Sequence, residues 1–362
     1  MISVEVKLAS SSYPVYLGGG LLSQAGLLER HLGSGKTLIV SNDVVAPLYI
    51  DQVMTSLANR DVEIHIIPDG ERFKTAETWY SIIDKLVGMQ ARRDANLIAL
   101  GGGVIGDIAG FAAACYMRGI RFLQLPTTLL AQVDAAIGGK TAINHVEGKN
   151  LVGAFHQPAA VIIDPSTLAS LPEREFNAGL AEVVKYGAIN DVGFFAWLEQ
   201  NAAAIRQRHE GALNHLILES VKNKSEIVSQ DEKEAGIRAL LNFGHSFGHA
   251  LEAASNYSRF LHGEAVSIGM VTAARLSEIR GLCQTGTTKR LETLLSILGL
   301  PVKQPADIKI NDLTKALALD KKALVSGPRL VLLKAMGHAV VDNRSSEDDI
   351  LAAMKQSVVS PD

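Results

Sequence analysis

The sequence predicts a protein of two domains, an α/β domain over residues 1–172 and a mainly α-helical domain over residues 173–362. The length of 362 residues exceeds what one hydrophobic core usually organises. Short apolar runs alternate with helical patterns through the first half, which is typical of a parallel sheet with crossover helices. From about Glu173 onward, helical periodicity dominates.

The expected elements of the first domain alternate between strand and helix, with turns rich in Gly, Pro and Asp between them. Strands are expected over 2–8, 13–17, 37–40, 62–67, 96–100, 122–125 and 160–163. Helices are expected over 21–32, from after Asp43 to about Ala58, over 75–92 and over 108–117.

In the second domain the apolar residues recur at helical spacing. Helices are expected over 179–189, 192–200, 202–227, 245–255, 262–280 and 312–321, followed by a hairpin over 329–341 and a final helix from Ser346.

Composition excludes several classes of protein. A formal net charge of -3 gives no global basic field of the kind that attracts nucleic acid or anionic lipid. With only Cys115 and Cys283, no disulfide framework is expected. Both cysteines are expected to be buried as small apolar residues, in a protein of the reducing cytosol. Neither a signal peptide nor an apolar run of membrane-spanning length is visible. The sequence therefore predicts a cytoplasmic protein without nucleic-acid or membrane partners.

A glycine run, Gly101 to Gly106, follows an expected strand and precedes a helix. Strand, glycine turn and helix together form a phosphate-binding arrangement. The run reads Gly-Gly-Gly-x-x-Gly-Asp rather than the usual dinucleotide fingerprint, so a plain tight turn remains an alternative. Asp107 is either a charge complement of the helix or a cofactor contact. In the turn from Asp69 onward, Glu71 could meet a ribose and Lys74 a phosphate, although a solvated turn explains them equally well.

The segment between Arg118 and Asn150 carries cations beside glycines. Lys140 follows Gly138-Gly139, and Lys149 follows Gly148. Glycines bring the backbone close to a ligand, so these lysines are expected on ligand-facing loops rather than scattered over the surface.

The second half offers metal ligands. His245 and His249 are four residues apart and share a helix face, although many such pairs are ordinary helix histidines. Glu182, with His245 and His262, makes the two imidazoles and one carboxylate of a catalytic zinc site. The alternative for Glu182 is a simple helix salt bridge with Lys185.

Taken together, these segments resemble the 3-dehydroquinate synthase family of the sugar phosphate cyclase superfamily, over nearly the whole chain. The most specific stretches are Gly101–Gly110, Met117–Asn150, Leu171–Glu175, Glu182–Lys185, Leu241–His249 and His262–Glu264.

The resemblance implies a Rossmann-like NAD-binding domain, a helical domain that binds Zn²⁺ or Co²⁺, and a homodimer. It implies conversion of 3-deoxy-D-arabino-heptulosonate 7-phosphate to 3-dehydroquinate and phosphate, a step of the shikimate pathway toward chorismate and the aromatic amino acids. NAD would oxidise the substrate transiently, phosphate would be eliminated, and re-reduction and aldol cyclisation would follow.

The resemblance also assigns site residues by position. The metal ligands would be Glu182, His245 and His262. Catalytic and substrate contacts would be Arg118, Lys140, Asn150, Lys185, Lys224, Arg238, Asn242, His249 and Lys321. Cofactor contacts would be Asn42, Asp69, Glu71, Lys74, Gly102, Gly103, Val104, Asp107, Thr127, Thr128, Asp134, Lys140, Lys149, Thr167, Leu168, Ala169, Ser170, Leu171 and Glu175. The family often has a Phe at the turn beginning at Thr167, and this chain lacks it.

Our hypothesis is that His249 is a hydrogen-bonding or proton-relay group rather than a metal ligand. Three alternatives to the main function remain: a cyclase for another sugar phosphate, a metal-dependent alcohol or polyol dehydrogenase, and a non-catalytic phosphosugar-binding protein.

Overall fold

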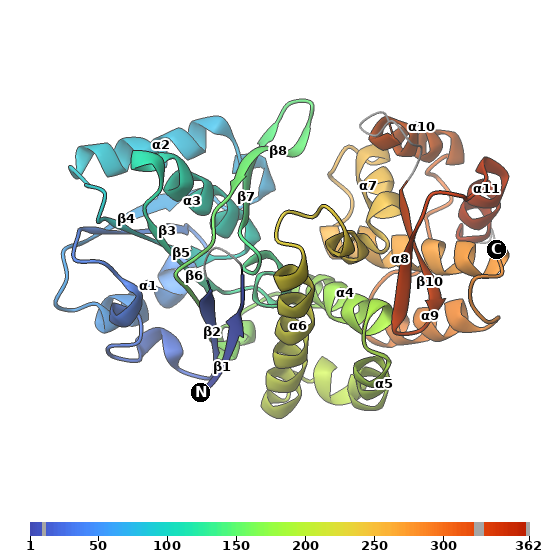
Figure 1. Ribbon diagram of the computed structural model, residues 1–362, viewed down its shortest axis with the longest axis horizontal. Helices are drawn as coiled ribbons and strands as arrows, with labels where there is room; N and C mark the ends of the chain where they lie inside the picture. The colour runs from blue at the N-terminus through green and yellow to red at the C-terminus, as the bar shows by residue number, and fades with distance from the viewer. Residues whose placement is uncertain (9–11, 322–328, 360–362) are drawn as a thin grey trace. The chain divides into compact units, whose positions relative to one another are not determined.

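The computed structural model describes residues 1–8, 12–321 and 329–359. The chain divides into two compact units (Figure 1), Met1–Leu171 with Lys224–Lys233, and Pro172–Asn223 with Glu234–Asp362. The first is an α/β unit and the second is mainly helical, so the fold class predicted from the sequence is confirmed.

The segment Lys224–Lys233 belongs to the first unit, whereas the predicted boundary placed it in the second domain. Its contacts explain the difference. Lys224 Nζ donates to the Asp134 carboxylate at 2.7 Å, and Gln157 Nε2 donates to Glu232 Oε1 at 3.0 Å. Helical periodicity shows that this segment is a helix, but it carries no information about the side chains that pair with its end.

A seven-stranded sheet in the order β1-β2-β9-β6-β5-β3-β4 forms the centre of the first unit. Its strands are β1 (Ile2–Val6), β2 (Tyr13–Leu17), β3 (Thr37–Asn42), β4 (Val62–Ile67), β5 (Asn96–Gly101), β6 (Arg121–Pro126) and β9 (Ala160–Ile163). β1 pairs antiparallel with β2, and the other pairs are parallel. The carboxyl ends of β9, β6, β5, β3 and β4 therefore lie along one edge.

Both faces of this sheet are covered. On β3, Leu38 joins an apolar core with α2 (Ala76–Gly88) and α3 (Gly103–Cys115), whereas Ile39 joins a second core with α1 (Ala46–Ser56). Successive strand residues point to opposite faces, so a strand buried on both sides needs apolar residues at every position. The central strands accordingly read as continuous apolar runs.

The helix predicted over 21–32 is wrong. The structure has two short 3₁₀ turns, η1 (Leu21–Ser23) and η2 (Glu29–His31). Between them Gly26 has a φ of 74°, a left-handed conformation that interrupts a right-handed helix.

The loops predicted around the lysines are also wrong. Residues Lys140–His145 form β7 and Gly148–Phe155 form β8, an antiparallel ribbon. Exposed apolar side chains on β8, such as Leu151 and Val152, blur the alternation of buried and exposed residues that marks most strands.

The second unit is built around α8 (His262–Ile279), which contacts α4, α7, α9, α11 and β10. The remaining elements are α4 (Glu173–Ile189), α5 (Val192–Arg206), α6 (Glu210–Gln230, whose residues from Lys224 onward belong to the first unit), α7 (His245–Ala254), α9 (Thr287–Ile297), α10 (Ile310–Lys321), α11 (Glu347–Gln356) and the hairpin of β10 (Leu330–Ala335) with β11 (His338–Asp342). The sequence did not predict α9. Among the described helices, none has the length and apolar character needed to cross a bilayer.

The prediction that both cysteines are buried is wrong. Cys115 is exposed and Cys283 is partly exposed, and both are free thiols. Cys115 is the last residue of α3 and Cys283 lies just beyond the end of α8, so both occupy the ends of helices rather than their apolar faces.

Candidate active site

Three helices of the second unit bring one carboxylate and two imidazoles together. Glu182 lies in the middle of α4, His245 is the first residue of α7, and His262 is the first residue of α8. The Nε2 atoms of His245 and His262 lie 3.6 Å and 4.0 Å from Glu182 Oε1. Ligand atoms about 2.1 Å from a tetrahedral ion lie roughly 3.4 Å apart, so small side-chain rotations would bring these three onto one cation.

The Glu182 carboxylate has the properties of a metal ligand. Its side chain is completely buried, and among the described residues Oε1 accepts no hydrogen bond. Lys185 Nζ forms an ion pair with Oε2, so the helix salt bridge considered from the sequence is present, at one edge of the carboxylate. Burial of a charged group is costly without compensation. A divalent cation would supply that compensation, so the residues fit a metal.

His245 is held in the form that binds metals. Its Nδ1 lies 3.3 Å from the carbonyl oxygen of Phe243, which can only accept a hydrogen bond. Nδ1 therefore carries the proton, and Nε2 presents a lone pair toward Glu182. Burial lowers the pKa of His245 well below its ordinary value, and the positive charge of Lys185 lowers it further, so the ring is neutral at neutral pH.

Two glycines allow these helices to approach closely. A Cβ on Gly263 would lie 1.9 Å from the carbonyl oxygen of Ala178, one turn before Glu182 on α4. A Cβ on Gly269 would lie 2.0 Å from the carbonyl oxygen of Gly244, the residue that precedes His245. Any larger residue at either position would push α8 away from the helix that supplies another ligand.

His249 lies beside the cluster but differs from the two ligands in its surroundings. It is exposed, whereas His245 and His262 are partly buried. Its ring stands edge-on to that of His245, with centroids 5.6 Å apart. His249 also forms a second possible metal-binding group with Glu252 and His262. It is thus accessible to a substrate beside the Glu182 cluster.

The other predicted substrate residues of the second unit are mostly buried. Lys185 and Arg238 are each 1% exposed, and Asn242 Nδ2 donates to Glu234 Oε1 at 2.6 Å. Lys321 ends α10, but its side chain lies outside the described residues.

The first unit gathers most of the predicted cofactor residues at the carboxyl edge of its sheet. Asn42 ends β3, Gly102 follows β5, and Thr127 follows β6. The chain leaves β3 and β5 in opposite directions along the sheet, so a topological switch point lies between them. Ligands of open α/β sheets bind at such a point. The other members of this edge are Asp69, Gly103, Val104, Thr128 and the turn Thr167–Leu171.

The start of α3 is suited to a phosphate. The helix begins at Gly103, within the glycine run, and no side chain caps its first turn. Its open N–H groups and the positive end of its dipole favour an anion. Thr127 lies after the neighbouring strand, and its Oγ1 is buried without a hydrogen-bond partner among the described residues.

Lys74 connects a predicted cofactor contact, Asp107, with a predicted substrate contact, Asn150. It is 3% exposed, and its Nζ donates to Asp107 Oδ2 and to Asn150 Oδ1, each at 2.5 Å. Burial raises the pKa of the Asp107 carboxyl, while the charge of Lys74 acts in the opposite direction. Glu71 accepts a hydrogen bond at 2.7 Å from Asn144 of the ribbon. The turn that the sequence left open as merely solvated is therefore joined to the β7–β8 ribbon.

The remaining predicted residues are less closely grouped. Lys140 is the first residue of β7 and Lys149 the second residue of β8, and Arg118 is exposed with a φ of 65°. Asp134 pairs with Lys224. Glu175 lies on the exposed first turn of α4 in the second unit, so the structure does not group it with the cofactor edge.

Two acidic residues near the site were missed from the sequence. Glu252 lies beside His262, and Glu234 accepts the hydrogen bond from Asn242. Glu252 is three residues after His249 and therefore shares its helix face, which is the signal that could have indicated it. No comparable signal marks Glu234, which lies in an irregular segment.

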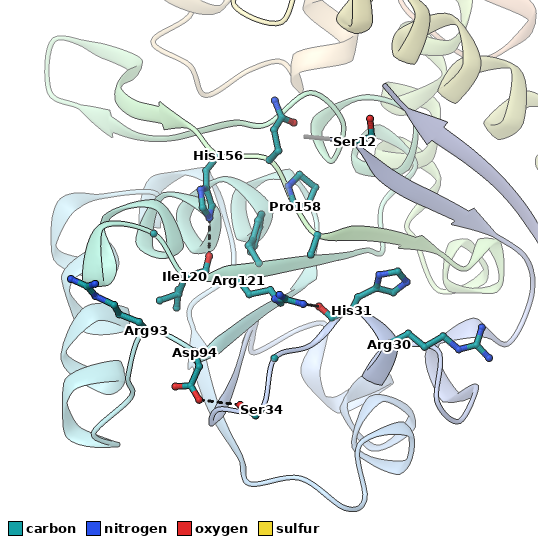
Figure 2. Close-up of a pocket in the computed structure, with 15 residues that line it drawn as sticks. Ser12, Arg30, His31, Ser34, Arg93, Asp94, Ile120, Arg121, His156 and Pro158 are labelled. Carbon is teal, nitrogen blue, oxygen red and sulfur yellow. Dashed lines mark hydrogen bonds between the residues drawn. The ribbon is translucent and has the colours of Figure 1, made fainter. Parts of the chain in front are cut away.

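A cavity of about 630 Å³ opens at the opposite, amino edge of the sheet (Figure 2). It is lined by residues before β5, β6 and β9, and none of the predicted site residues takes part. Arg30 and Arg93 point away from one another, and Arg121 Nη1 donates to the carbonyl oxygen of His31 at 3.3 Å. The cations do not converge on one ligand, so this cavity is not the candidate site.

Comparison with known proteins identifies the relatives of the chain. A family model described as 3-dehydroquinate synthase N-terminal matches residues 64–178, and one described as 3-dehydroquinate synthase C-terminal matches residues 179–323. The 3-dehydroquinate synthase of Methylococcus capsulatus is 49% identical over 341 residues, which cover 94% of this chain and 95% of the relative. That of Nitrosococcus oceani is 47% identical over 359 residues, covering 99% and 100%.

A solved structure extends the similarity. The 2-epi-5-epi-valiolone synthase of Streptomyces hygroscopicus subsp. jinggangensis, solved with NAD⁺ and Zn²⁺ bound, superposes with a TM-score of 0.88. It is 33% identical and covers 97% of this chain and 98% of its own.

Replacement of Gly263 by Ala should force α4 and α8 apart. We expect the free energy of unfolding to fall by about 1–3 kcal/mol and metal binding to weaken. Denaturant unfolding and metal titration measure these effects. Gly211→Ala in α6 is the matched control, since a Cβ there meets no atom within 4 Å. Equal stability of the two variants would contradict the role of Gly263.

Proposed function

Because the chain belongs to the 3-dehydroquinate synthase family, we propose that it converts 3-deoxy-D-arabino-heptulosonate 7-phosphate to 3-dehydroquinate and phosphate, using NAD and a divalent cation. The observation that carries this proposal is the arrangement of Glu182, His245 and His262, in which both histidine Nε2 atoms face the buried Oε1 of Glu182, an atom that accepts no hydrogen bond among the described residues. The reaction is a carbon–oxygen lyase reaction and belongs to the shikimate pathway.

The chemistry explains the need for both cofactors. Phosphate must leave from a carbon whose neighbouring C–H is not acidic, and oxidation of the adjacent alcohol to a ketone makes that C–H acidic. When bound, NAD would supply the transient oxidation, and a divalent cation would lower the pKa of the alcohol and polarise the ketone. Return of the hydride to the ketone would leave NAD unchanged over a turnover.

In the second unit, Glu182, His245 and His262 would hold the cation, Zn²⁺ or Co²⁺. Lys185 and Arg238 would bind the anionic groups of the substrate, since both are positively charged side chains that are buried. Asn242, held by Glu234, would orient a substrate oxygen. His249, exposed beside the ligands, would donate or relay a proton.

In the first unit, the carboxyl edge of the sheet would bind NAD. The open start of α3 at Gly102 and Gly103 would hold the pyrophosphate, with Thr127 donating its unused hydroxyl hydrogen. The substrate contacts of this unit would be Arg118, Lys140, Asn150 and Lys224. Asn150 is already oriented by Lys74, which connects it to Asp107.

We further propose that the protein works in the cytoplasm as a homodimer without nucleic-acid partners. Two free thiols are typical of a reducing compartment. Among the described residues β8 pairs only with β7, and it exposes Leu151, Val152 and Phe155, which supports association with a second copy through this edge. Light scattering should give twice the chain mass of 38.7 kDa, and a monomer at micromolar concentration would contradict this.

The purified protein should release inorganic phosphate from the heptulosonate phosphate only when both NAD and a divalent cation are present. A chelator should abolish release, and Zn²⁺ or Co²⁺ should restore it. Sedoheptulose 7-phosphate and glucose 6-phosphate test the other cyclases, and net accumulation of NADH would indicate a dehydrogenase. Binding without any phosphate release would indicate a non-catalytic protein, and no turnover of the first substrate would refute the proposal.

His249→Ala should lower turnover by about 10²–10⁴-fold, the usual contribution of a positioned acid or base, while the bound metal stays at wild-type stoichiometry. Metal analysis and steady-state kinetics of the same preparation separate the two effects. His338→Ala replaces an exposed histidine of β11 and should change neither. Loss of metal from the His249 variant would show that His249 is a ligand.

A further inference from the structure

We propose that Glu252 is a positioning residue that orients His262 for metal binding, an inference that rests on the proposed metal dependence of the enzyme. Glu252 lies on α7, two turns after His245, and is 2% exposed. Its carboxylate Oε2 lies 3.6 Å from Nδ1 of His262. The two ring nitrogens of His262 thus face two different buried carboxylates.

The orientation of the His262 ring distinguishes the nitrogen that would bind the metal from the nitrogen that faces Glu252. Nε2 faces Glu182 Oε1, the predicted metal side, and Nδ1 faces Glu252. A carboxylate beside Nδ1 favours the tautomer with the proton on that nitrogen, which leaves the lone pair of Nε2 for the metal. Such a partner also fixes the plane of the ring and increases the basicity of the ligand.

His245 shows the same arrangement with a different partner. Its Nδ1 faces the carbonyl oxygen of Phe243, and its Nε2 faces Glu182. Both histidines therefore direct Nε2 toward the same carboxylate and hold an acceptor behind Nδ1. His245 obtains its acceptor from the backbone just before α7. The acceptor behind His262, on α8, is the carboxylate of Glu252 from α7.

Glu252 has a second possible role, because it forms a group with His249 and His262 that could hold a metal. The geometry favours positioning. Glu252 faces Nδ1 of His262, whereas the Nε2 atoms of His245 and His262 face Glu182 Oε1, which accepts no hydrogen bond among the described residues. A bound divalent cation would lower the cost of burying both carboxylates, in addition to the compensation that Lys185 gives to Glu182.

The test measures metal affinity and coordination in Glu252→Gln. We expect one Co²⁺ per chain, bound about 10–100-fold more weakly than in wild type by chelator competition, with a shifted visible Co²⁺ spectrum. Glu182→Gln is the ligand benchmark and should abolish binding. Glu347→Gln, which removes an exposed carboxylate on α11, should leave affinity and spectrum unchanged.

A second measurement decides the question even if Glu252→Gln folds poorly. In the Zn²⁺-loaded wild type labelled with ¹⁵N-histidine, the shifts of His262 should show a proton on Nδ1 and metal on Nε2. Metal on Nδ1 would overturn the proposal.

The remaining outcomes also discriminate. Complete loss of Co²⁺ from Glu252→Gln, as from Glu182→Gln, would make Glu252 a ligand. Unchanged affinity and spectrum would remove any role at the metal. Wild-type protein that binds no divalent cation would overturn the proposed function as well, whereas the first two results overturn this inference alone.

Discussion

The second unit depends on one buried carboxylate, that of Glu182. Glu182 is placed in the interior of α4, where burial costs free energy unless an opposite charge compensates it. Lys185 compensates one edge of the carboxylate, and the histidines that begin α7 and α8 face the other. The close contacts at Gly263 and Gly269 keep these helices at the required separation. The close packing of α8 against α4 and the start of α7 therefore also sets the distances between the three predicted metal ligands.

The ligands at the starts of α7 and α8 also have a structural origin. A first-turn residue is fixed by the cap that precedes it, and its side chain is not crowded by an earlier turn. Gly244, with a φ of 82°, turns the chain sharply before His245. Leu261 precedes His262, and its N–H donates a hydrogen bond to the side chain of Glu264, in the first turn of α8. Glu264 also pairs with Arg174. The motif around His262 thus contains the residues that fix where its helix begins.

Much of the fold could be predicted because the signals were local. Continuous apolar runs gave β3, β5 and β6, and helical periodicity gave α8. The errors arose where a distant contact or a backbone conformation decides the outcome. The ribbon of β7 and β8 was missed because its exposed apolar residues break the usual alternation, and the helix expected from residue 21 is interrupted at Gly26.

The candidate site shows the same limit. Residue type pointed to Glu182, His245 and His262 as a zinc ligand set, the family resemblance assigned them by position, and the structure brings them together. Spacing alone left Glu182 with Lys185 as a plain ion pair, and that pair also exists. Glu252 was missed because its spacing from His249 indicates only a shared helix face, whereas its importance comes from the direction of the His262 ring.

The two proposed ligand sets fall almost entirely in separate units, since all three metal ligands lie in the second and nearly all NAD contacts in the first. Each ligand therefore stabilises chiefly the unit that binds it, by an amount set by its free concentration relative to its dissociation constant. Metal limitation would weaken one half of the enzyme and NAD depletion the other. The abundance of intact protein in a cell would then depend on two nutritional variables at once, independently of the amount of substrate.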